Sequence, residues 1–209
     1  MENYKIYKNT RIGPNFNIGF YVILGHPPRG KSEGEMKTII GANAIIRSHT
    51  IIYAGNTIGD NLQTGHNVMI REENKIGDNV SIGTSTIIEH HVIIENNVRI
   101  HSQTFIPEYS ILEEGCWLGP NVVLTNALHP LCPKVPECIK GPTIKKNVKI
   151  GANATLSPDI VIGEGSLIGS GSVVVKDVPS GVVVAGNPAK IIKNINELNC
   201  PYDLIEKPY

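Results

Sequence analysis

The sequence predicts an all-β protein built as a parallel β-helix of stacked, three-sided coils. The first observation is a strict six-residue spacing of aliphatic residues, which fits neither a helix nor an alternating strand. The second is that Gly and Asn recur at fixed places between the aliphatic residues. The third is that three such hexads make a coil whose neighbours should lie about 4.8 Å apart, as adjacent strands do. A fixed short period indicates that one unit is stacked many times.

The six-residue step is unbroken from residue 40 to residue 124, and Thr64 is the one position in it that is neither Ile nor Leu. Each hexad should therefore contribute one inward aliphatic side chain to a narrow core. Ordinary strands of a sandwich would instead show alternation and irregular spacing. The positions of the step are Ile40, Ile46, Ile52, Ile58, Thr64, Ile70, Ile76, Ile82, Ile88, Ile94, Ile100, Ile106, Leu112, Leu118 and Leu124.

Gly and Asn mark the expected corners of the coil. Both residue types accept a positive φ, so we expect each hexad to supply its own corner. Glycine directly follows the aliphatic residue at Gly41, Gly59, Gly65, Gly77, Gly83 and Gly119. Asparagine stands three places after it at Asn43, Asn61, Asn67, Asn79, Asn97 and Asn121.

The repeat also sets the expected organisation of the chain. Residues 1–11 read as a polar lead-in, residues 12–192 as a β-helix domain of about eight coils, and residues 193–209 as a tail that begins with a short helix or turn. Two loops rich in Gly, Pro and charge, at 25–37 and 125–143, should interrupt the coils. A long loop inside a compact repeat is more often functional than accidental.

Bulk composition narrows the class of protein. The 19 Lys and Arg balance the 19 Asp and Glu, so no net field attracts nucleic acid or an anionic membrane. We see no apolar run of signal-peptide or membrane-spanning length, and we expect a soluble cytoplasmic protein. The four cysteines are too few and too scattered for a disulfide scaffold.

One face of the expected coil carries a dense group of ionisable side chains. Residues 18 apart should lie one above the other, so Glu72, His90, Glu108 and Asn126 should form a column in which an imidazole lies between carboxylates. Arg71 should lie beneath Glu89 in the neighbouring column. A carboxylate near an imidazole favours its charged form and orients the ring, which suits a general base. The alternative is a solvated charged face with a surface histidine.

The loop after Leu124 supplies a second candidate base, His129. The same loop contains Cys132 and Cys138, and these three residues could be read as metal ligands. Their spacing, H-x2-C-x5-C, matches no closed four-ligand pattern, and two surface cysteines in a reducing cytosol are the more ordinary interpretation.

The hexads at 58–63, 76–81 and 150–155 follow the pattern [Ile/Leu]-Gly-x-Asn-[Val/Ala]-x, which resembles the hexapeptide-repeat acyltransferases over residues 12–192. The resemblance implies a left-handed β-helix, a homotrimer with active sites between subunits, acetyl-CoA as co-substrate, and no metal. The segments 169–179 and 186–190 are similar to the end of the acetyl-CoA branch. They imply that the pantetheine arm lies near Gly151, Ala152, Ser170, Lys176 and Lys190.

Two branches of this family compete. The run 119–130 resembles the galactoside and maltose O-acetyltransferases, whose catalytic His falls on His129. The runs 70–73, 88–92, 105–108 and 119–126 look more like nucleotide-sugar N-acetyltransferases, which acetylate the 3-amino group of UDP- or dTDP-linked sugars for glycan synthesis. In that branch a Tyr commonly replaces the loop His. Ile88-Glu-His-His-Val92 also resembles the lipid A acyltransferases and the bacillosamine acetyltransferase, whose catalytic His falls on His90.

These resemblances predict direct attack by a sugar amine, or second by a hydroxyl, on the acetyl thioester. His90 or His129 would accept the proton, and a corner backbone N–H, for example in the turns at Gly151 or Gly169, would stabilise the oxyanion. A carboxylate of Glu72, Glu89 or Glu108 would fix the imidazole. The residues expected to contact the substrate are Arg71, Glu72, Glu89, Glu108, Asn121 and Asn126.

Two rival classes stay open at this point. A γ-type carbonic anhydrase uses the same coil, but it needs three His around one zinc, two of them spaced H-x4-H, and no pair of histidines here is five apart. A purely structural β-helix would need neither the interrupting loop nor the ionisable column.

Overall fold

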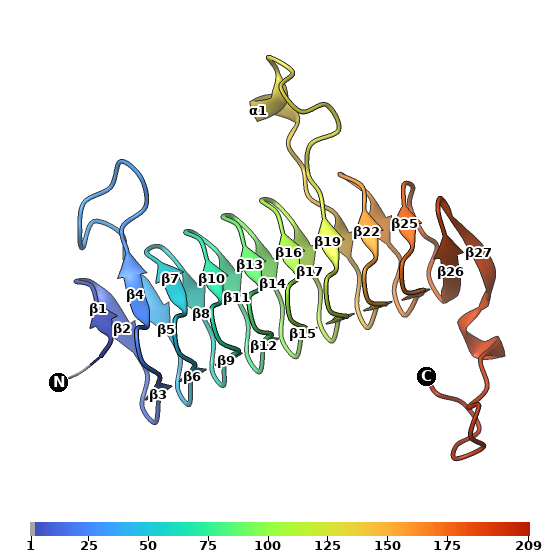
Figure 1. The fold of residues 1–209 in the computed structure, drawn as a ribbon, viewed down its shortest axis with the longest axis horizontal. Helices are drawn as coiled ribbons and strands as arrows, with labels where there is room; N and C mark the ends of the chain where they lie inside the picture. The colour runs from blue at the N-terminus through green and yellow to red at the C-terminus, as the bar shows by residue number, and fades with distance from the viewer. Residues whose placement is uncertain (1–2) are drawn as a thin grey trace.

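The structure is a computed structural model that describes residues 3–209. It is a prism of stacked coils, with short parallel strands along each of three sides (Figure 1). Strand i of one coil pairs with strand i+3 of the next, so each side of the prism is one parallel sheet. A one-dimensional stack of this kind buries a continuous core only because each coil covers its neighbours.

Three sheets make up the sides, and we number them by their first strand. The first sheet consists of β1 Lys5–Ile6, β4 Ile23–His26, β7 Ile51–Tyr53, β10 Met69–Ile70, β13 Ile87–Ile88, β16 Phe105–Ile106, β19 Val123–Leu124, β22 Thr155–Leu156 and β25 Val173–Val174. The second sheet consists of β2 Thr10–Ile12, β5 Thr38–Ile40, β8 Thr57–Ile58, β11 Lys75–Ile76, β14 Ile93–Ile94, β17 Ile111–Leu112, β20 Thr143–Ile144 and β23 Val161–Ile162. The third sheet consists of β3 Asn17–Ile18, β6 Ile45–Ile46, β9 Gln63–Thr64, β12 Ser81–Ile82, β15 Arg99–Ile100, β18 Trp117–Leu118, β21 Lys149–Ile150, β24 Leu167–Ile168, β26 Val182–Gly186 and β27 Ala189–Asn194.

The register between coils is the predicted one. Ile70 pairs with Ile52 below it and with Ile88 above it, so residues 18 apart are vertical neighbours. The second sheet has eight strands, which agrees with the expected count of about eight coils. The parallel, nearly all-β architecture confirms the predicted fold class.

The core is the stack of aliphatic residues that the six-residue step predicted. Ile52, Ile70, Ile88 and Ile106 are each completely buried on the first side. The exception, Thr64, is also buried, and its hydroxyl accepts a hydrogen bond from the backbone N–H of Arg47 at 3.0 Å. The polar atom is satisfied, so one threonine is accommodated in the row.

Asparagine makes the corners, as predicted. Asn61 and Asn79 have φ of 61° and 58°, and the side-chain amide of Asn61 donates to the Asn79 amide oxygen of the next coil at 2.8 Å. The glycines that follow the aliphatic residues are required for a different reason from the one that we expected. Gly83 does not adopt a positive φ; a Cβ there would lie 2.3 Å from the backbone N of Ser102 in the next coil. These glycines are therefore needed for close approach between coils rather than for a left-handed backbone.

The two ends of the prism differ from its middle. β1 and the start of β2 come from the segment that we expected to be a lead-in, and they pair with β4 and β5. At the other end β26 and β27 form an antiparallel hairpin on the third sheet. The 3-10 helix η1, Ile195–Glu197, follows it where a short helix or turn was expected.

Both long loops leave the coil at the same edge, where the chain passes from the first sheet to the second. Residues 27–37 connect β4 to β5, and residues 125–142 connect β19 to β20 and contain the short helix α1, Val135–Cys138. Figure 1 shows the two loops projecting from the same side of the prism. Within residues 3–209 no helix has the length and apolar character required to cross a bilayer.

Candidate active site

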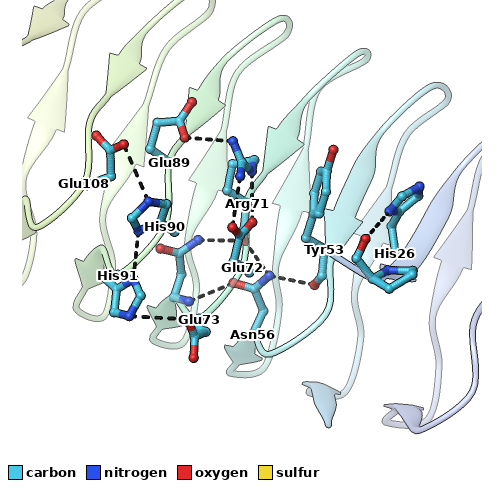
Figure 2. Close-up of polar contacts among 12 residues, drawn as sticks. His26, Tyr53, Asn56, Arg71, Glu72, Glu73, Glu89, His90, His91 and Glu108 are labelled. Atoms are coloured by element: carbon cyan, nitrogen blue, oxygen red, sulfur yellow. Dashed lines mark hydrogen bonds and ion pairs between the residues drawn. The ribbon is translucent and has the colours of Figure 1, made fainter. Parts of the chain in front are cut away.

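The edge between the first and second sheets brings the predicted ionisable column together. We call it the ionisable edge, residues 71–73, 89–91, 107–109 and 125–126. Because Ile70, Ile88 and Ile106 are in register, the residues two places later stack as well. The Nε2 atom of His90 lies 3.6 Å from Oε1 of Glu108 (Figure 2). One rung further, Asn126 Nδ2 donates to Glu108 Oε2 at 2.6 Å.

Arg71 neutralises part of this edge. Its guanidinium donates to both carboxylate oxygens of Glu72, at 2.9 and 2.9 Å, and to Glu89 Oε2 at 3.2 Å, as the predicted stacking of Arg71 beneath Glu89 requires. The guanidinium carbon also lies 5.2 Å from the ring centroid of Tyr53. Such bidentate, stacked contacts suit arginine and would be lost with lysine. Arg71 is therefore already bound by two protein carboxylates.

The pKa values of Glu72 and Glu89 are shifted in opposite directions. Burial opposes ionisation of Glu72, but the hydrogen bonds and charge of Arg71 outweigh it, and the pKa of Glu72 is lowered. Burial is the largest influence on Glu89 and raises its pKa, with Arg71 opposing it. A lowered carboxyl pKa contributes stability that is present above the ordinary carboxyl pKa and lost as the pH falls through the lowered value. A raised pKa has the opposite sign, because the folded state then favours the protonated form.

Replacing Arg71 with Met should therefore destabilise the protein more at pH 7 than at pH 4. At pH 7 both carboxylates would be ionised and partly buried without their cation, whereas at pH 4 and below protonation relieves them. The measurement is the urea midpoint of the wild type and R71M from pH 3 to 8. A difference that does not change with pH would show that Arg71 acts by packing alone.

His90 is held by a partner that we did not predict. Its Nδ1 atom lies 2.8 Å from Nδ1 of His91, and the Nε2 atom of His91 lies 3.3 Å from Oε2 of Glu73. The hydrogen-bonding partner of the His90 imidazole is thus His91, while Glu108 is the expected carboxylate that makes an ion-pair contact with the ring. The tyrosine ring of Tyr109 lies beside both imidazoles, with centroids at 6.0 and 5.5 Å. Glu73, His91 and Tyr109 are themselves 18 apart, one place beyond the predicted column, and that spacing could have found them.

The second candidate base lies elsewhere. His129 is exposed, in the loop that extends away from the coils (Figure 1). Its backbone carbonyl accepts from the N–H of Cys132 at 3.2 Å. Among the described residues no hydrogen bond or ion pair joins His129 to His90. One protomer therefore does not assemble the two candidate bases into one group.

The cysteines of this loop are free thiols. Cys138 donates to the carbonyl of Lys134 at 3.4 Å, and Cys132 is partly buried. Within residues 3–209 no group of three or more His, Cys, Asp or Glu side chains is arranged to hold a metal ion. Cys116 is a core residue, and burial raises the pKa of its thiol to about 12.

The residues expected to bind acetyl-CoA fall into two groups. Gly151, Ala152 and Ser170 stack on the edge between the third and first sheets, where Asn121 also lies. We call this the glycine edge, residues 119–121, 151–153 and 169–171. Within the turns that were expected to supply an oxyanion donor, the N–H groups of Gly151 and Gly169 themselves are occupied, because each donates to a carbonyl of the next coil at 2.8 Å.

Lys176 and Lys190 form the second group. Both line a cavity of about 250 Å³ at the C-terminal end of the prism, between β25 and the β26–β27 hairpin. Its floor is apolar, with Val174 and Val184 among the lining residues. Lys176 follows β25. It therefore lies two coils beyond Asn126, on the continuation of the ionisable edge toward the C-terminal end. The cavity thus combines two cations with apolar walls, and it also includes Asp177, whose Oδ1 atom accepts a hydrogen bond from the N–H of Val161.

A second cavity, which the sequence did not indicate, adjoins Gly151. It measures about 280 Å³ and is also lined by Trp117, Lys149, Leu167 and Tyr209. Burial lowers the pKa of Lys149, whose Nζ lies 4.2 Å from the ring centroid of Tyr209. The sequence signal that could have found it is the outward position of Trp117, Lys149 and Leu167 on three successive strands.

Comparison with known proteins agrees with the repeat. The profile of the bacterial transferase hexapeptide family (six repeats) matches residues 75–108 and 141–176. A 25-residue segment is 76% identical to 2,3,4,5-tetrahydropyridine-2,6-dicarboxylate N-acetyltransferase of Clostridium perfringens; it covers 12% of this chain and only 11% of that protein. A solved structure of a Bacillus cereus protein described as an acetyltransferase is 24% identical, with 82% of this chain and 83% of that chain covered and a TM-score of 0.52. The UDP-N-acetylglucosamine acyltransferase LpxA from Bacteroides fragilis is 16% identical, with 90% and 72% covered and a TM-score of 0.60.

Fold and repeats together define the class: the chain is a left-handed parallel β-helix, and its residues 75–108 and 141–176 match bacterial transferase hexapeptide repeats. The resemblance to hexapeptide-repeat acetyltransferases that the hexads indicated is confirmed. At 24% and 16% identity, the likeness to the two solved structures shows the fold.

Proposed function

We propose that this protein is an acetyltransferase that moves the acetyl group of acetyl-CoA to the amino group of a nucleotide-linked sugar, a UDP or dTDP 3-amino sugar. The observation that carries the proposal is His90. Its Nε2 atom faces Glu108 on the edge from which both loops leave, and its Nδ1 atom is engaged by His91. An imidazole held on one side and 27% exposed is the arrangement that a general base requires.

In the proposed reaction the sugar amine attacks the thioester carbonyl carbon. The amine loses one proton, which His90 Nε2 accepts. The tetrahedral intermediate collapses, the C–S bond breaks, and the imidazolium returns the proton to the sulfur so that CoA leaves as the thiol. The carboxylate of Glu108 stabilises the imidazolium while it exists. Only one proton moves, so a base of ordinary strength within hydrogen-bond reach suffices.

The charge of the ionisable edge favours an amine over a hydroxyl as the acceptor. This edge carries four carboxylates and a single guanidinium, that of Arg71. Arg71 pairs with Glu72 and Glu89, whereas Glu73 and Glu108 face the two histidines. An amine that arrives protonated is attracted to such a surface and releases its first proton to solvent; His90 then accepts the second proton, which is the one lost in the attack. In this proposal Asn121 and Asn126 contact the sugar together with the carboxylates.

A homotrimer is the working form in this proposal. Gly151, Ala152 and Ser170 lie on the glycine edge, whereas Lys176 and His90 lie on the ionisable edge, across the first sheet from them. If the glycine edge of one protomer faces the ionisable edge of another, one acetyl-CoA can contact both groups. His129, in its projecting loop, would then reach a neighbouring protomer. Sedimentation analysis of the purified protein tests the assembly.

Lys176 and Lys190 should bind the phosphates of CoA. Replacing either with Ala should raise the KM for acetyl-CoA about 10-fold, because a charge-assisted hydrogen bond contributes roughly 1.5–3 kcal/mol. The same variants should leave the KM for acetyl-pantetheine, which has no phosphates, unchanged. Lys193→Ala is the matched control, since Lys193 is on β27 but outside the cavity lining. Equal effects on both donors would contradict this assignment.

The test of the proposed function is a panel assay that measures release of free thiol from acetyl-CoA. UDP- and dTDP-linked amino sugars are compared with simple galactosides. Turnover confined to amino sugars supports the proposal. Turnover confined to galactosides would replace it with an O-acetyltransferase, and stoichiometric zinc together with CO2 hydration would replace it with a carbonic anhydrase.

A further inference from the structure

We propose that His91, with Glu73 behind it, is a positioning residue that fixes the tautomer of the His90 imidazole and leaves its Nε2 atom free to accept a proton. The catalytic consequence rests on the proposed function. The tautomer itself is a property of the protein alone and can be measured without any substrate.

Three contacts in series carry the proposal (Figure 2). Glu73 Oε2 lies 3.3 Å from His91 Nε2, His91 Nδ1 lies 2.8 Å from His90 Nδ1, and His90 Nε2 points toward Glu108 Oε1 at 3.6 Å. The contact between the two rings is a hydrogen bond, whereas the contacts at the two ends are ion pairs, of which the one to Glu73 is the shorter. The series therefore runs from the Glu73 carboxylate through His91 to the outward nitrogen of His90.

The proton positions follow from the ends of the series. A carboxylate accepts only, so the closer carboxylate, that of Glu73, favours a proton on the His91 Nε2 atom that faces it. A neutral His91 then has a bare Nδ1, which can only accept. His90 Nδ1 must be the donor in the contact between the two rings, and a neutral His90 consequently has no proton on Nε2. The unprotonated Nε2 is the atom that a general base needs. The Glu108 carboxylate, 3.6 Å away, would stabilise the positive charge that forms on the imidazole.

The surroundings of the two rings hold this arrangement in place. Tyr109 lies edge-on to His90 at 88° and is tilted by 36° to His91. Asn126 occupies the other oxygen of Glu108, and Arg71 engages Glu72 and Glu89, the remaining carboxylates near His90. Glu73 and Glu108 are thus the carboxylates that contact the two rings directly.

The backbone indicates that this corner is specialised. Glu73, His91 and Tyr109 have φ of 60°, 57° and 63°, a conformation that asparagine adopts more readily. At the edge between the second and third sheets the same turn position is filled by hydrogen-bonded asparagines, such as Asn61 and Asn79. Residues held in sparsely populated backbone regions cluster at functional sites.

The direct test is nitrogen NMR of the protein with 15N-labelled histidine, at a pH where the imidazoles are neutral. In the wild type we expect His90 to carry its proton on Nδ1 and His91 on Nε2. In His91→Phe, His90 should change to the Nε2–H form, because its Nδ1 loses its acceptor. An Nε2–H form of His90 in the wild type, or no change in the variant, would overturn the proposal.

The kinetic test compares His91→Phe with His91→Asp. Phe should lower kcat on the order of 10-fold or more, within the roughly 10²–10⁴ that a general base contributes, and leave KM nearly unchanged. Asp offers a carboxylate that accepts the Nδ1 proton directly and should restore most of kcat. His49→Phe is the matched control, because His49 also has a positive φ, 64°, and lies away from the ionisable edge.

The outcomes of the two tests separate the proposals. If no acceptor in the panel is acetylated by the wild type, the proposed function fails while the NMR result still decides the tautomer. If the wild type is active and His91→Asp is as slow as His91→Phe, with folding confirmed by the urea midpoint, His91 does not act through the tautomer of His90 and the inference is wrong.

Discussion

Replacing His90 with Ala is expected to lower kcat by about 10²- to 10⁴-fold, the contribution of a positioned general base. KM for acetyl-CoA should change little, since the residues proposed to bind it lie on the glycine edge and around the C-terminal cavity. The substitution removes the atom that accepts the amine proton while leaving the coil intact, because His90 is at an edge and not in the core.

The control for this substitution is His66→Ala, since His66 is an exposed histidine that no proposed contact uses. His129→Ala belongs in the same series. A large loss for His129→Ala together with normal turnover for His90→Ala would move the base to the loop. Normal turnover in both variants would mean that a neutral amine attacks without assistance.

Replacing Ile100 with Ala should destabilise the protein by about 2–5 kcal/mol, the range for large-to-small substitutions in a core. Ile100 is 1% exposed and stacks between Ile82 and Leu118 in the third sheet. The coil has little freedom to close the resulting cavity, because strands on all three sides are fixed by their neighbours. Denaturant unfolding followed by the fluorescence of Trp117, the single tryptophan, measures the loss.

Ile93→Ala is the matched control for Ile100→Ala. Ile93 lies on β14, the strand that precedes the strand of Ile100, but its side chain points outward and is 40% exposed. Its replacement should change stability by no more than about 0.5 kcal/mol, as expected for surface positions. Similar losses of stability in the two variants would contradict the view that the inward aliphatic residues stabilise the stack of coils.

The fold could be predicted from the sequence because one rule applies to every coil. The inward row from Ile40 to Leu124 fixed both the period and the side of each residue, and the 18-residue spacing then placed Glu72, His90 and Glu108 in one column. The same spacing placed Arg71 beneath Glu89. These contacts follow from register alone, and register is set by the core.

Features outside that rule were missed or misjudged. The 18-residue spacing could have placed His91 in a column with Glu73 and Tyr109, but the contact between the rings of His90 and His91 depends on side-chain orientation, which register does not give. The glycines after each aliphatic residue were given a backbone reason, although the close approach of the next coil is what excludes a side chain at Gly83. The loop that carries His129 has no periodicity, so its path could not be derived.

The insertion between β19 and β20 does not disturb the register on either side of it. Val123 and Leu124 still pair with Thr155 and Leu156 of the next coil, as if the intervening segment were absent. The pairing of the coils therefore does not depend on the loop. Its length and chemistry can vary without a change in the pairing of the coils on either side of it.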